Sequence, residues 1–311
     1  MNPETVLQNF KEHRLALNMS ERTIDGDAVL LRKFFDYLEY EGIENLTDVD
    51  TEVLLKYQIY VSALRTKKGE LYSPATRKRH LTVVGVMFQY LWLKGEVFYN
   101  PVSKLERIKV PKQLPAGILS IEEVQTLLDQ PDISTWLGLR DRAIMEVFYS
   151  TAMRRNELIN LDLLDLYPDR KTMHIRQGKY LKDRVVPCGR VAWKWLSKYL
   201  EEARPLRIAN PDEQAVFINQ HGCRLGQQGI KTLMDKYGKQ ASISKSVTPH
   251  IFRHTCATHM HDNGASIRRL QEILGHESIE TTARYIRVSI VKLKQTHKQC
   301  HPREMTAEKI A

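Results

Sequence analysis

Six side chains between residues 154 and 285 have the chemistry that metal-free cleavage of a phosphodiester requires. The hydroxyl of Tyr285 is a candidate nucleophile, because a phosphotyrosine keeps the energy of the broken bond and lets the strand be rejoined without ATP. Guanidinium groups bind nonbridging phosphate oxygens, imidazoles donate hydrogen bonds to developing charge, and an ammonium group can protonate the leaving 5′ oxygen. Arg154 and Arg253 are the candidate phosphate-binding residues. His250 and His276 are the candidate hydrogen-bond donors, and Lys179 is the candidate proton donor.

The spacing within residues 248–288 is compatible with a common site. His250 and Arg253 are three positions apart, so they share a face if the segment is helical. Gly275 permits a sharp turn that presents His276, and Tyr285 follows on a later segment. Together these residues are much less expected by chance than any one of them.

Each candidate also has an ordinary structural interpretation. A single tyrosine such as Tyr285 is most often a core or interface residue, and Arg154 could simply pair with Glu157. Lys179 belongs to a basic hairpin in which Lys182 is an alternative proton donor. Structural or solvent-exposed positions are expected for three further histidines of the segment, His254, His259 and His261.

The chain lacks the common motifs of metal- and nucleotide-dependent phosphoryl chemistry. It contains neither H-E-x-x-H nor G-x-x-x-x-G-K-[ST], and its two D-x-D pairs, at 25–27 and 48–50, lie far along the sequence from the candidate residues. The four cysteines show no C-x-x-C motif, which favours reduced thiols over a zinc site or disulfides. We therefore predict a reaction that uses no metal and no cofactor.

The charge of the chain predicts a polyanionic partner. The formal net charge is +10 and the isoelectric point is about 9.3, which favours nucleic acid over an acidic membrane surface. Acidic residues gather in positions 1–50, whereas basic residues dominate from position 56 to position 112. The residues that we expect to contact DNA are Lys67, Lys68, Arg77, Lys78, Arg79 and Lys112.

Length and hydropathy predict a soluble protein with two domains. A chain of 311 residues suggests about two domains, and a hydrophobic content of 42% is sufficient for their cores. No apolar run reaches the ~18–20 residues that a membrane-spanning helix needs, and positions 1–10 lack the pattern of a signal peptide. We expect a cytoplasmic protein that does not contact membranes.

Residues 1–109 are predicted to form a helical domain. Ser73-Pro74 marks the start of a long helix whose first turns carry the basic residues 77–79. An earlier helix, capped by Ser20, would present one apolar face made of Ile24, Val29, Leu30, Phe34 and Leu38. Residues 110–118 contain two prolines and a glycine, so we expect a semi-rigid linker there.

Residues 119–311 are predicted to form a mixed α/β domain. A capping box at 120–123 opens its first helix, and apolar spacing predicts further helices over 141–149, 191–203 and 229–237. Residues 173–176 and 184–187 have the alternating, β-branched character of two strands of a hairpin, with Lys179 between them. The predicted fold class is therefore mainly α with a small β-sheet.

Five motifs resemble the signature of the tyrosine recombinase, or phage integrase, family. Residues 151–158 (T-A-M-R-R-N-E-L) are similar to T-G-L-R-x-x-E-L, and residues 178–187 (G-K-Y-L-K-D-R-V-V-P) are similar to G-K-G-x-K-x-R-x-V-P. H-x-x-R-H, L-G-H and T-T-x-x-Y follow in the family's order, with their last residues at 254, 276 and 285. The resemblance implies that Arg154, not Arg155, is catalytic, and that Lys179 is the catalytic lysine. Ala152 and Tyr180 replace glycines of the family pattern.

The resemblance covers nearly the whole chain and implies both fold and function. It implies a helical core-binding domain at 1–109 and a tyrosine-recombinase catalytic domain at 119–311, in an Xer-like layout that suits dimer resolution or a mobile element. The implied reaction cuts and rejoins double-stranded DNA at a specific site through a 3′-phosphotyrosyl intermediate and a Holliday junction. The residues after Tyr285 would dock on a neighbouring subunit in a tetramer on two DNA sites. Two alternatives stay open, namely a type IB topoisomerase-like enzyme and a DNA-binding regulator without catalysis.

Overall fold

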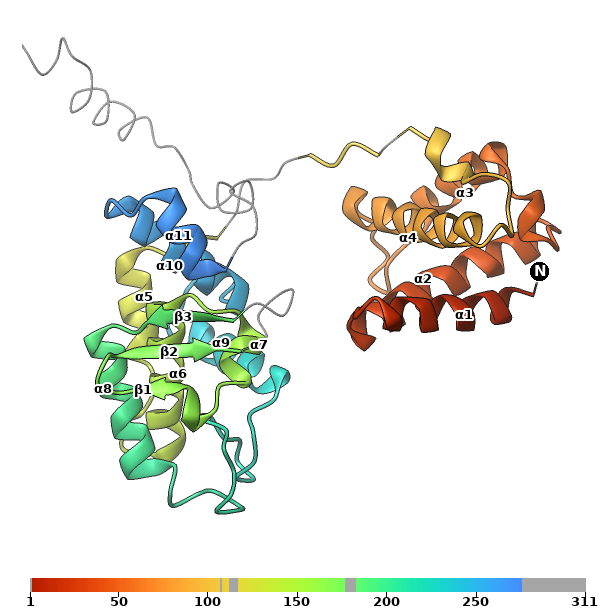
Figure 1. Cartoon of the computed structure of the whole chain (residues 1–311). Helices are drawn as coiled ribbons and strands as arrows, with labels where there is room; N and C mark the ends of the chain where they lie inside the picture. Colours follow the sequence, from red (N-terminus) through yellow and green to blue (C-terminus); the bar gives the residue numbers. More distant parts are fainter. Residues whose placement is uncertain (1, 107, 112–116, 177–182, 276–311) are drawn as a thin grey trace, which may run out of the picture. The chain divides into compact units, whose positions relative to one another are not determined.

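The chain folds into two compact units, Met1–Lys112 (unit 1) and Gln113–Ala311 (unit 2) (Figure 1). The computed structural model describes residues 2–106, 108–111, 117–176 and 183–275. Helices dominate both units, and the second also contains a three-stranded sheet, so the fold class is mainly α with a small β-sheet. Within the described residues, every helix is too short or too polar to cross a membrane.

Unit 1 is a bundle of helices around an aromatic core. Its elements are α1 (Pro3–Ala16), α2 (Glu21–Tyr40), the 3₁₀ turn η1 (Leu46–Asp48), α3 (Thr51–Ala63), α4 (Pro74–Leu93) and the 3₁₀ turn η2 (Pro101–Lys104). Each of the four α-helices follows an N-cap residue whose side chain accepts a hydrogen bond from an N–H group of the first turn. These residues are Asn2, Ser20, Asp50 and Ser73. At the centre, the ring of Phe34 lies 4.8 Å from that of Tyr57 and 6.2 Å from that of Phe88.

One residue of the apolar face predicted for α2 was assigned wrongly. Ile24 is buried as expected, but Val29 is 54% exposed. Residues that follow Ile24 by one and two helical turns, Ala28 and Leu31, occupy the buried face instead. Val29 is five positions from Ile24, which turns its side chain well away from that face.

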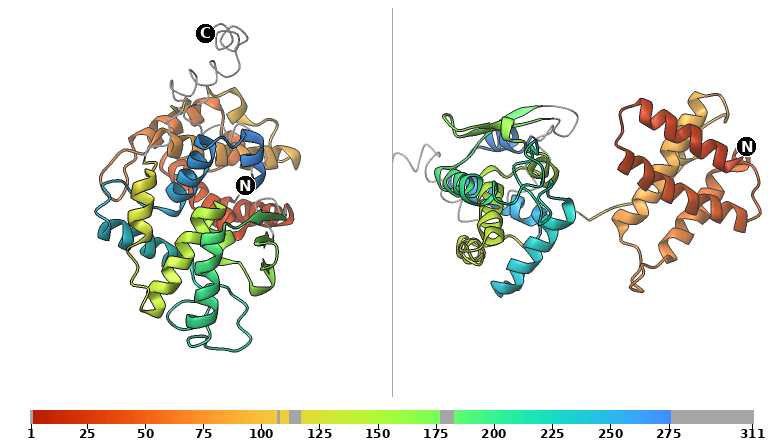
Figure 2. Two further views of the ribbon diagram at one scale, coloured as in Figure 1. Left: turned by 90° about the vertical axis from the view of Figure 1, so that its left-hand side faces the viewer. Right: turned by 90° about the horizontal axis from the view of Figure 1, so that it is seen from below.

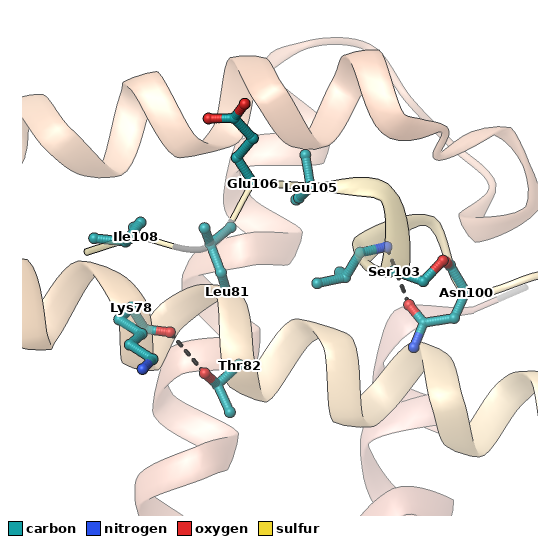
Figure 3. Close-up of a pocket in the computed structure, with 9 residues that line it drawn as sticks. Lys78, Leu81, Thr82, Asn100, Ser103, Leu105, Glu106 and Ile108 are labelled. Atoms are coloured by element: carbon teal, nitrogen blue, oxygen red, sulfur yellow. Dashed lines mark hydrogen bonds between the residues drawn. The ribbon is translucent and has the colours of Figure 1, made fainter. Parts of the chain in front are cut away.

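The last residues of unit 1 pack along α4 and enclose a cavity of about 390 Å³ with it (Figure 3). Asn100 fastens this segment, because its side-chain amide donates to the carbonyl of Gly85 on α4 (2.9 Å) and its side-chain oxygen accepts from the N–H of Val102 (3.1 Å). The lining residues are Lys78, Leu81, Thr82, Asn100, Val102, Ser103, Leu105, Glu106 and Ile108.

Unit 2 places the sheet and several helices around the buried helix α6. Its elements are α5 (Ile121–Leu128), α6 (Trp136–Thr151), α7 (Arg155–Ile159), η3 (Leu163–Asp165), β1 (Leu166–Tyr167), β2 (Thr172–Ile175), β3 (Arg184–Pro187), α8 (Arg190–Lys198), the π-helical turn η5 (Tyr199–Ala203), α9 (Gln227–Gln240), α10 (Pro249–Asp262) and α11 (Ile267–Leu274). The two views of Figure 2 show the sheet on one side of this unit, with α6 beneath it.

The sheet is antiparallel, in the order β1-β2-β3. Met173 faces Val186, and both are fully buried against the core, whereas Val185 on the opposite face is exposed. The two predicted strands are confirmed, and their register brings Arg184 opposite Ile175. Strand β1 was not predicted, because two residues are too few to show an alternating pattern.

Candidate active site

The structure describes three of the six predicted catalytic residues, Arg154, His250 and Arg253. Lys179, His276 and Tyr285 lie outside the described residues, as do the alternative proton donor Lys182 and the predicted DNA contact Lys112. In the part of the chain that the structure covers, no group of three or more His, Cys, Asp or Glu side chains could hold a metal ion. The geometry of the site therefore rests on the arginines and histidines of unit 2.

Arg154 follows a left-handed turn that ends α6. Ala152 adopts φ +48° and ψ +27°, and its N–H donates to the carbonyl of Phe148. Helices often end at such a residue, usually a glycine, because a Cβ costs free energy there. The turn forms here despite the alanine, whose fully buried methyl group packs against Leu274 and its neighbours.

Arg154 forms an ion pair with Glu157, as an ordinary structural arginine would, and it also contacts the end of α11. Its Nη1 donates to Oε1 of Glu157 (2.8 Å), and its backbone N–H donates to Oε2 of the same carboxylate (2.6 Å). Its Nη2 donates to the carbonyl oxygen of Gly275 (2.8 Å), which lies 121 positions later in the sequence. The side chain thus reaches the residue that precedes His276.

Arg253 approaches the same place from α10. This helix begins at the cap Thr248 with Pro249 in its first turn, and it buries Arg253 to 3% exposure. Nη1 of Arg253 donates to the carbonyl of Ala152 (2.5 Å), and Nη2 donates to that of Leu274 (2.6 Å). Two predicted phosphate-binding arginines therefore donate to adjacent carbonyls at the end of α11, which packs beside α10 (Figure 1).

The end of α11 attracts guanidinium groups for a physical reason. The last carbonyls of a helix lack intrahelical partners and carry its negative dipole end. Gly275 ends α11 in the left-handed conformation at φ +61°, and the carbonyls of Ile273, Leu274 and Gly275 all accept from arginines. The third donor is Nε of Arg184 on β3, at 3.1 Å from the oxygen of Ile273.

Glu157 joins Arg154 and Arg184 in one buried network. Arg184 donates to both oxygens of the carboxylate, at 2.9 and 2.7 Å, and only 6% of the Glu157 side chain is exposed. Burial raises the pKa of this carboxyl, but the hydrogen bonds and charges of Arg184, followed by those of Arg154, outweigh burial and lower the pKa to about 2. Sequence reasoning found the Arg154–Glu157 pair but missed Arg184.

His250 lies one turn before Arg253 and contacts a second histidine of α10. The Nε2 atoms of His250 and His254 are 3.1 Å apart, and their rings are nearly perpendicular. The Nε2 atom of one ring must carry the hydrogen and that of the other must accept it, so the tautomers of the two rings depend on each other. His254, which we expected to be structural or solvated, therefore contacts a candidate catalytic side chain.

The surroundings of these two histidines favour their neutral forms. Burial, and then the charge of Arg253, lowers the pKa of His250. Burial, His250 and Arg253 together lower the pKa of His254 to about 4. The structural interpretation holds for His259, which bonds the hydroxyl of Tyr149 (2.7 Å) and the carbonyl of Leu119 (2.9 Å).

The described residues predicted to contact DNA lie in unit 1 and differ in their surroundings. Lys67 and Lys68 are exposed in the turn before α4, and Lys78 is exposed on its second turn. Arg77 donates to the carbonyl of Tyr72 (2.7 Å), which ties it to the base of the helix. The Arg79 side chain is 56% exposed and lies 3.4 Å from the buried carboxylate of Asp27.

Comparison with known proteins gives one consistent result. A profile of the phage integrase family matches residues 118–290. The chain is 36% identical over 299 residues to tyrosine recombinase XerC 2 of Ralstonia nicotianae, covering 96% of this chain and 86% of the relative. It is 37% identical over 290 residues to tyrosine recombinase XerD of Listeria monocytogenes, covering 92% and 94%. The solved structure of the XerH site-specific recombinase, bound to its palindromic difH substrate, has the same fold, with a TM-score of 0.74, 22% identity and coverage of 96% and 84%.

The low pKa of His254 predicts a pH-dependent stability. The ordinary pKa is 6.5 and the folded value is about 4, so the unfolded chain binds a proton between these values that the folded chain does not. The stabilisation is complete above pH 6.5 and falls as the pH drops towards 4. Between pH 7 and pH 5 the wild type should lose about 1 kcal/mol more unfolding free energy than His254→Asn, after allowance for solvent screening.

Denaturant titrations of the full chain at both pH values measure this difference. His221→Asn, which changes an exposed histidine, serves as the control and should keep the wild-type pH dependence. An equal loss in the wild type and His254→Asn would contradict the prediction.

Proposed function

The chain belongs to the phage integrase family and is a site-specific tyrosine recombinase, and we propose that Tyr285 is its nucleophile. The Tyr285 hydroxyl gives up its proton to solvent water as its oxygen attacks the scissile phosphorus, the bond from phosphorus to the 5′ oxygen breaks, and a 3′-phosphotyrosyl link remains. The departing 5′ oxygen takes a proton from Lys179, with Lys182 as the alternative donor. The 5′ hydroxyl of a partner strand then reverses the step, and two such exchanges pass through a Holliday junction.

The observation that carries this assignment is the meeting of Arg154 and Arg253 at the end of α11. Their Nη2 atoms donate to adjacent carbonyls, those of Gly275 and Leu274, which fixes the two guanidinium planes near each other. A scissile phosphate has two nonbridging oxygens, and two preorganised guanidinium groups suit the charge that develops on them. His276 is the next residue along the chain, which supports a role beside these arginines.

The histidine pair suits hydrogen bonding to the same phosphate. His250 is on α10 one turn from Arg253, and its lowered pKa keeps the ring neutral. A neutral ring with its hydrogen on Nε2 can donate to a phosphoryl oxygen when that bond replaces the contact with His254. We assign His250 and His276 to this role.

We also propose that the two units share the binding of double-stranded DNA. Residues 1–109 would form the core-binding domain, 110–118 the linker and 119–311 the catalytic domain. The relatives that match nearly the whole chain and the likeness to XerH, solved with its difH substrate bound, support this division. The face of unit 1 that we assign to DNA carries Lys67, Lys68, Arg77, Lys78, Arg79 and Lys112.

We further propose that four copies assemble on two DNA sites. The residues after Tyr285 continue with an amphipathic pattern that is too short to form a core of its own. Docking on a neighbouring copy would bury these apolar residues and link the subunits.

The nucleophile can be tested with the DNA on either side of the gene that encodes this chain. Nicked fragments of that DNA are incubated with wild type or Tyr285→Phe in EDTA and separated on a denaturing gel. The wild type should form a covalent adduct without metal, and the variant should not, because phenylalanine has no hydroxyl. Specific binding by both proteins without any adduct would contradict the catalytic role and favour a DNA-binding regulator.

The proposed DNA face predicts a change in the salt dependence of binding. Lys78→Ala with Arg79→Ala should weaken binding and reduce the slope of log K against log salt concentration by about 0.9 for each lost phosphate contact. Arg77→Ala should change the slope less, because Arg77 is held by the Tyr72 carbonyl. Lys56→Ala is the control, since its ammonium lies 3.2 Å from Glu52. Equal slopes for all variants would show that DNA binds elsewhere.

The assembly proposal predicts separate effects on binding and cooperativity. A chain truncated after Arg287 keeps all six proposed catalytic residues, so it should bind a single site with near wild-type affinity. It should lose cooperativity on paired sites, because the contact between subunits is gone. Gel-shift titrations on one and two sites measure both quantities, and unchanged cooperativity would reject the role of the tail.

A further inference from the structure

We infer that Arg184 is a positioning residue for the cleavage step, a role that rests on the proposed recombinase chemistry. Arg184 is the first residue of β3, at the foot of the predicted lysine-bearing hairpin, and 13% of its side chain is exposed. It is outside the six residues proposed to act on the phosphate. Its contacts nevertheless tie the start of α7, where Arg154 lies, to the end of α11.

Each part of the Arg184 guanidinium has a defined partner. Nη1 and Nη2 donate to the two oxygens of Glu157, at 2.9 and 2.7 Å, and Nε donates to the carbonyl of Ile273 at 3.1 Å. The same carboxylate accepts from the Nη1 and the backbone N–H of Arg154. Arg184 therefore fixes the carboxylate that fixes Arg154.

Arg184 also sets the position of the segment that leads to His276. The carbonyls of Ile273 and Gly275 accept from Arg184 and Arg154, respectively, and both arginines share Glu157. Loss of Arg184 would free one edge of the carboxylate and one carbonyl of α11 at once. Arg154 would then lose its fixed orientation without being changed itself.

Gly275 shows how closely Arg184 is built into the site. A Cβ added at this position would lie 2.9 Å from Cζ and from Nη1 of Arg184, and the residue already has φ +61°. The guanidinium could move aside only by giving up Glu157 or Ile273. Glycine is therefore required here by the arginine as well as by the backbone conformation.

Lysine cannot replace Arg184 in this arrangement. One ammonium group cannot match the planar fork that spans both carboxylate oxygens while a third donor reaches a carbonyl. Lysine does keep a positive charge beside buried Glu157, so Arg184→Lys should fold. We expect this variant to lower the rate of cleavage at saturating protein by about 10- to 100-fold, the size of effect that a small misplacement of a reacting group produces.

The test separates positioning of Arg154 from a general loss of structure. Adduct formation is measured at saturating protein on the DNA site located by the Tyr285 adduct, for wild type, Arg184→Lys, Arg154→Ala and the double variant. Each protein is also assayed on DNA whose scissile phosphate is a neutral methylphosphonate, which removes the charge that Arg154 would neutralise. Arg176→Lys is the matched control, because Arg176 pairs with Asp165 at the end of β2.

Three results would support the inference together. Arg184→Lys slows cleavage of the phosphodiester while its DNA affinity stays within about threefold of wild type, and Arg176→Lys changes neither the rate nor the affinity. The double variant is no slower than Arg154→Ala beyond about threefold, because both changes remove the same function. The methylphosphonate reduces the defect of Arg184→Lys as it reduces that of Arg154→Ala.

Other outcomes would overturn it. A wild-type rate for Arg184→Lys, losses that multiply in the double variant, or a defect that the methylphosphonate leaves unchanged would each reject positioning of Arg154. If Arg184→Lys fails to fold, Glu157→Gln removes the carboxylate that links Arg184 to Arg154 while keeping the shape of the side chain, and it must give the same pattern. If the wild type forms no adduct, the proposed function fails and the inference fails with it.

Discussion

The last three carbonyls of α11 organise the candidate active site. A helix end presents carbonyl oxygens at fixed positions, and those of Ile273, Leu274 and Gly275 accept from Arg184, Arg253 and Arg154. The donors come from a strand, a helix and a turn that are far apart in the sequence. Because the acceptors belong to three successive residues at one helix end, the three guanidinium groups converge on one place, and the left-handed turn at Gly275 sets the direction of the last carbonyl.

Such a concentration of positive charge needs a counter-charge to be stable before DNA binds. Like-charged groups in a partly buried place repel each other, and Glu157 offsets this by accepting from both Arg154 and Arg184. The low pKa of its carboxyl, about 2, keeps it ionised near neutral pH. The site thus has two arginines held by a carboxylate and a third, Arg253, whose Nη1 and Nη2 donate to backbone carbonyls.

Sequence reasoning recovered what local patterns encode and missed what distant contacts decide. The caps Ser20 and Ser73 and the strands of the hairpin follow from residue types at short spacing, and the structure confirms them. The contact between His250 and His254 was within reach, because the two are four positions apart on a predicted helix. The bonds of Arg184 were not, because one acceptor is a backbone carbonyl 89 positions away and carbonyls leave no signal in the residue types.

Two helices of the site end in the left-handed conformation, at Ala152 and at Gly275. Ala152 replaces a glycine of the family pattern, whereas Gly275 keeps it, and the surroundings of the two residues explain the difference. Ala152 and Gly275 each offer a carbonyl to an arginine, so both turns must be made. A left-handed alanine costs about 1 kcal/mol, and burial of its methyl group regains about the same amount, so alanine is tolerated at position 152. At position 275 a methyl group would meet the Arg184 guanidinium at 2.9 Å instead of the apolar cluster that surrounds Ala152. The left-handed conformation therefore tolerates alanine at position 152 but requires glycine at position 275, because the Arg184 guanidinium occupies the space that a side chain at 275 would need.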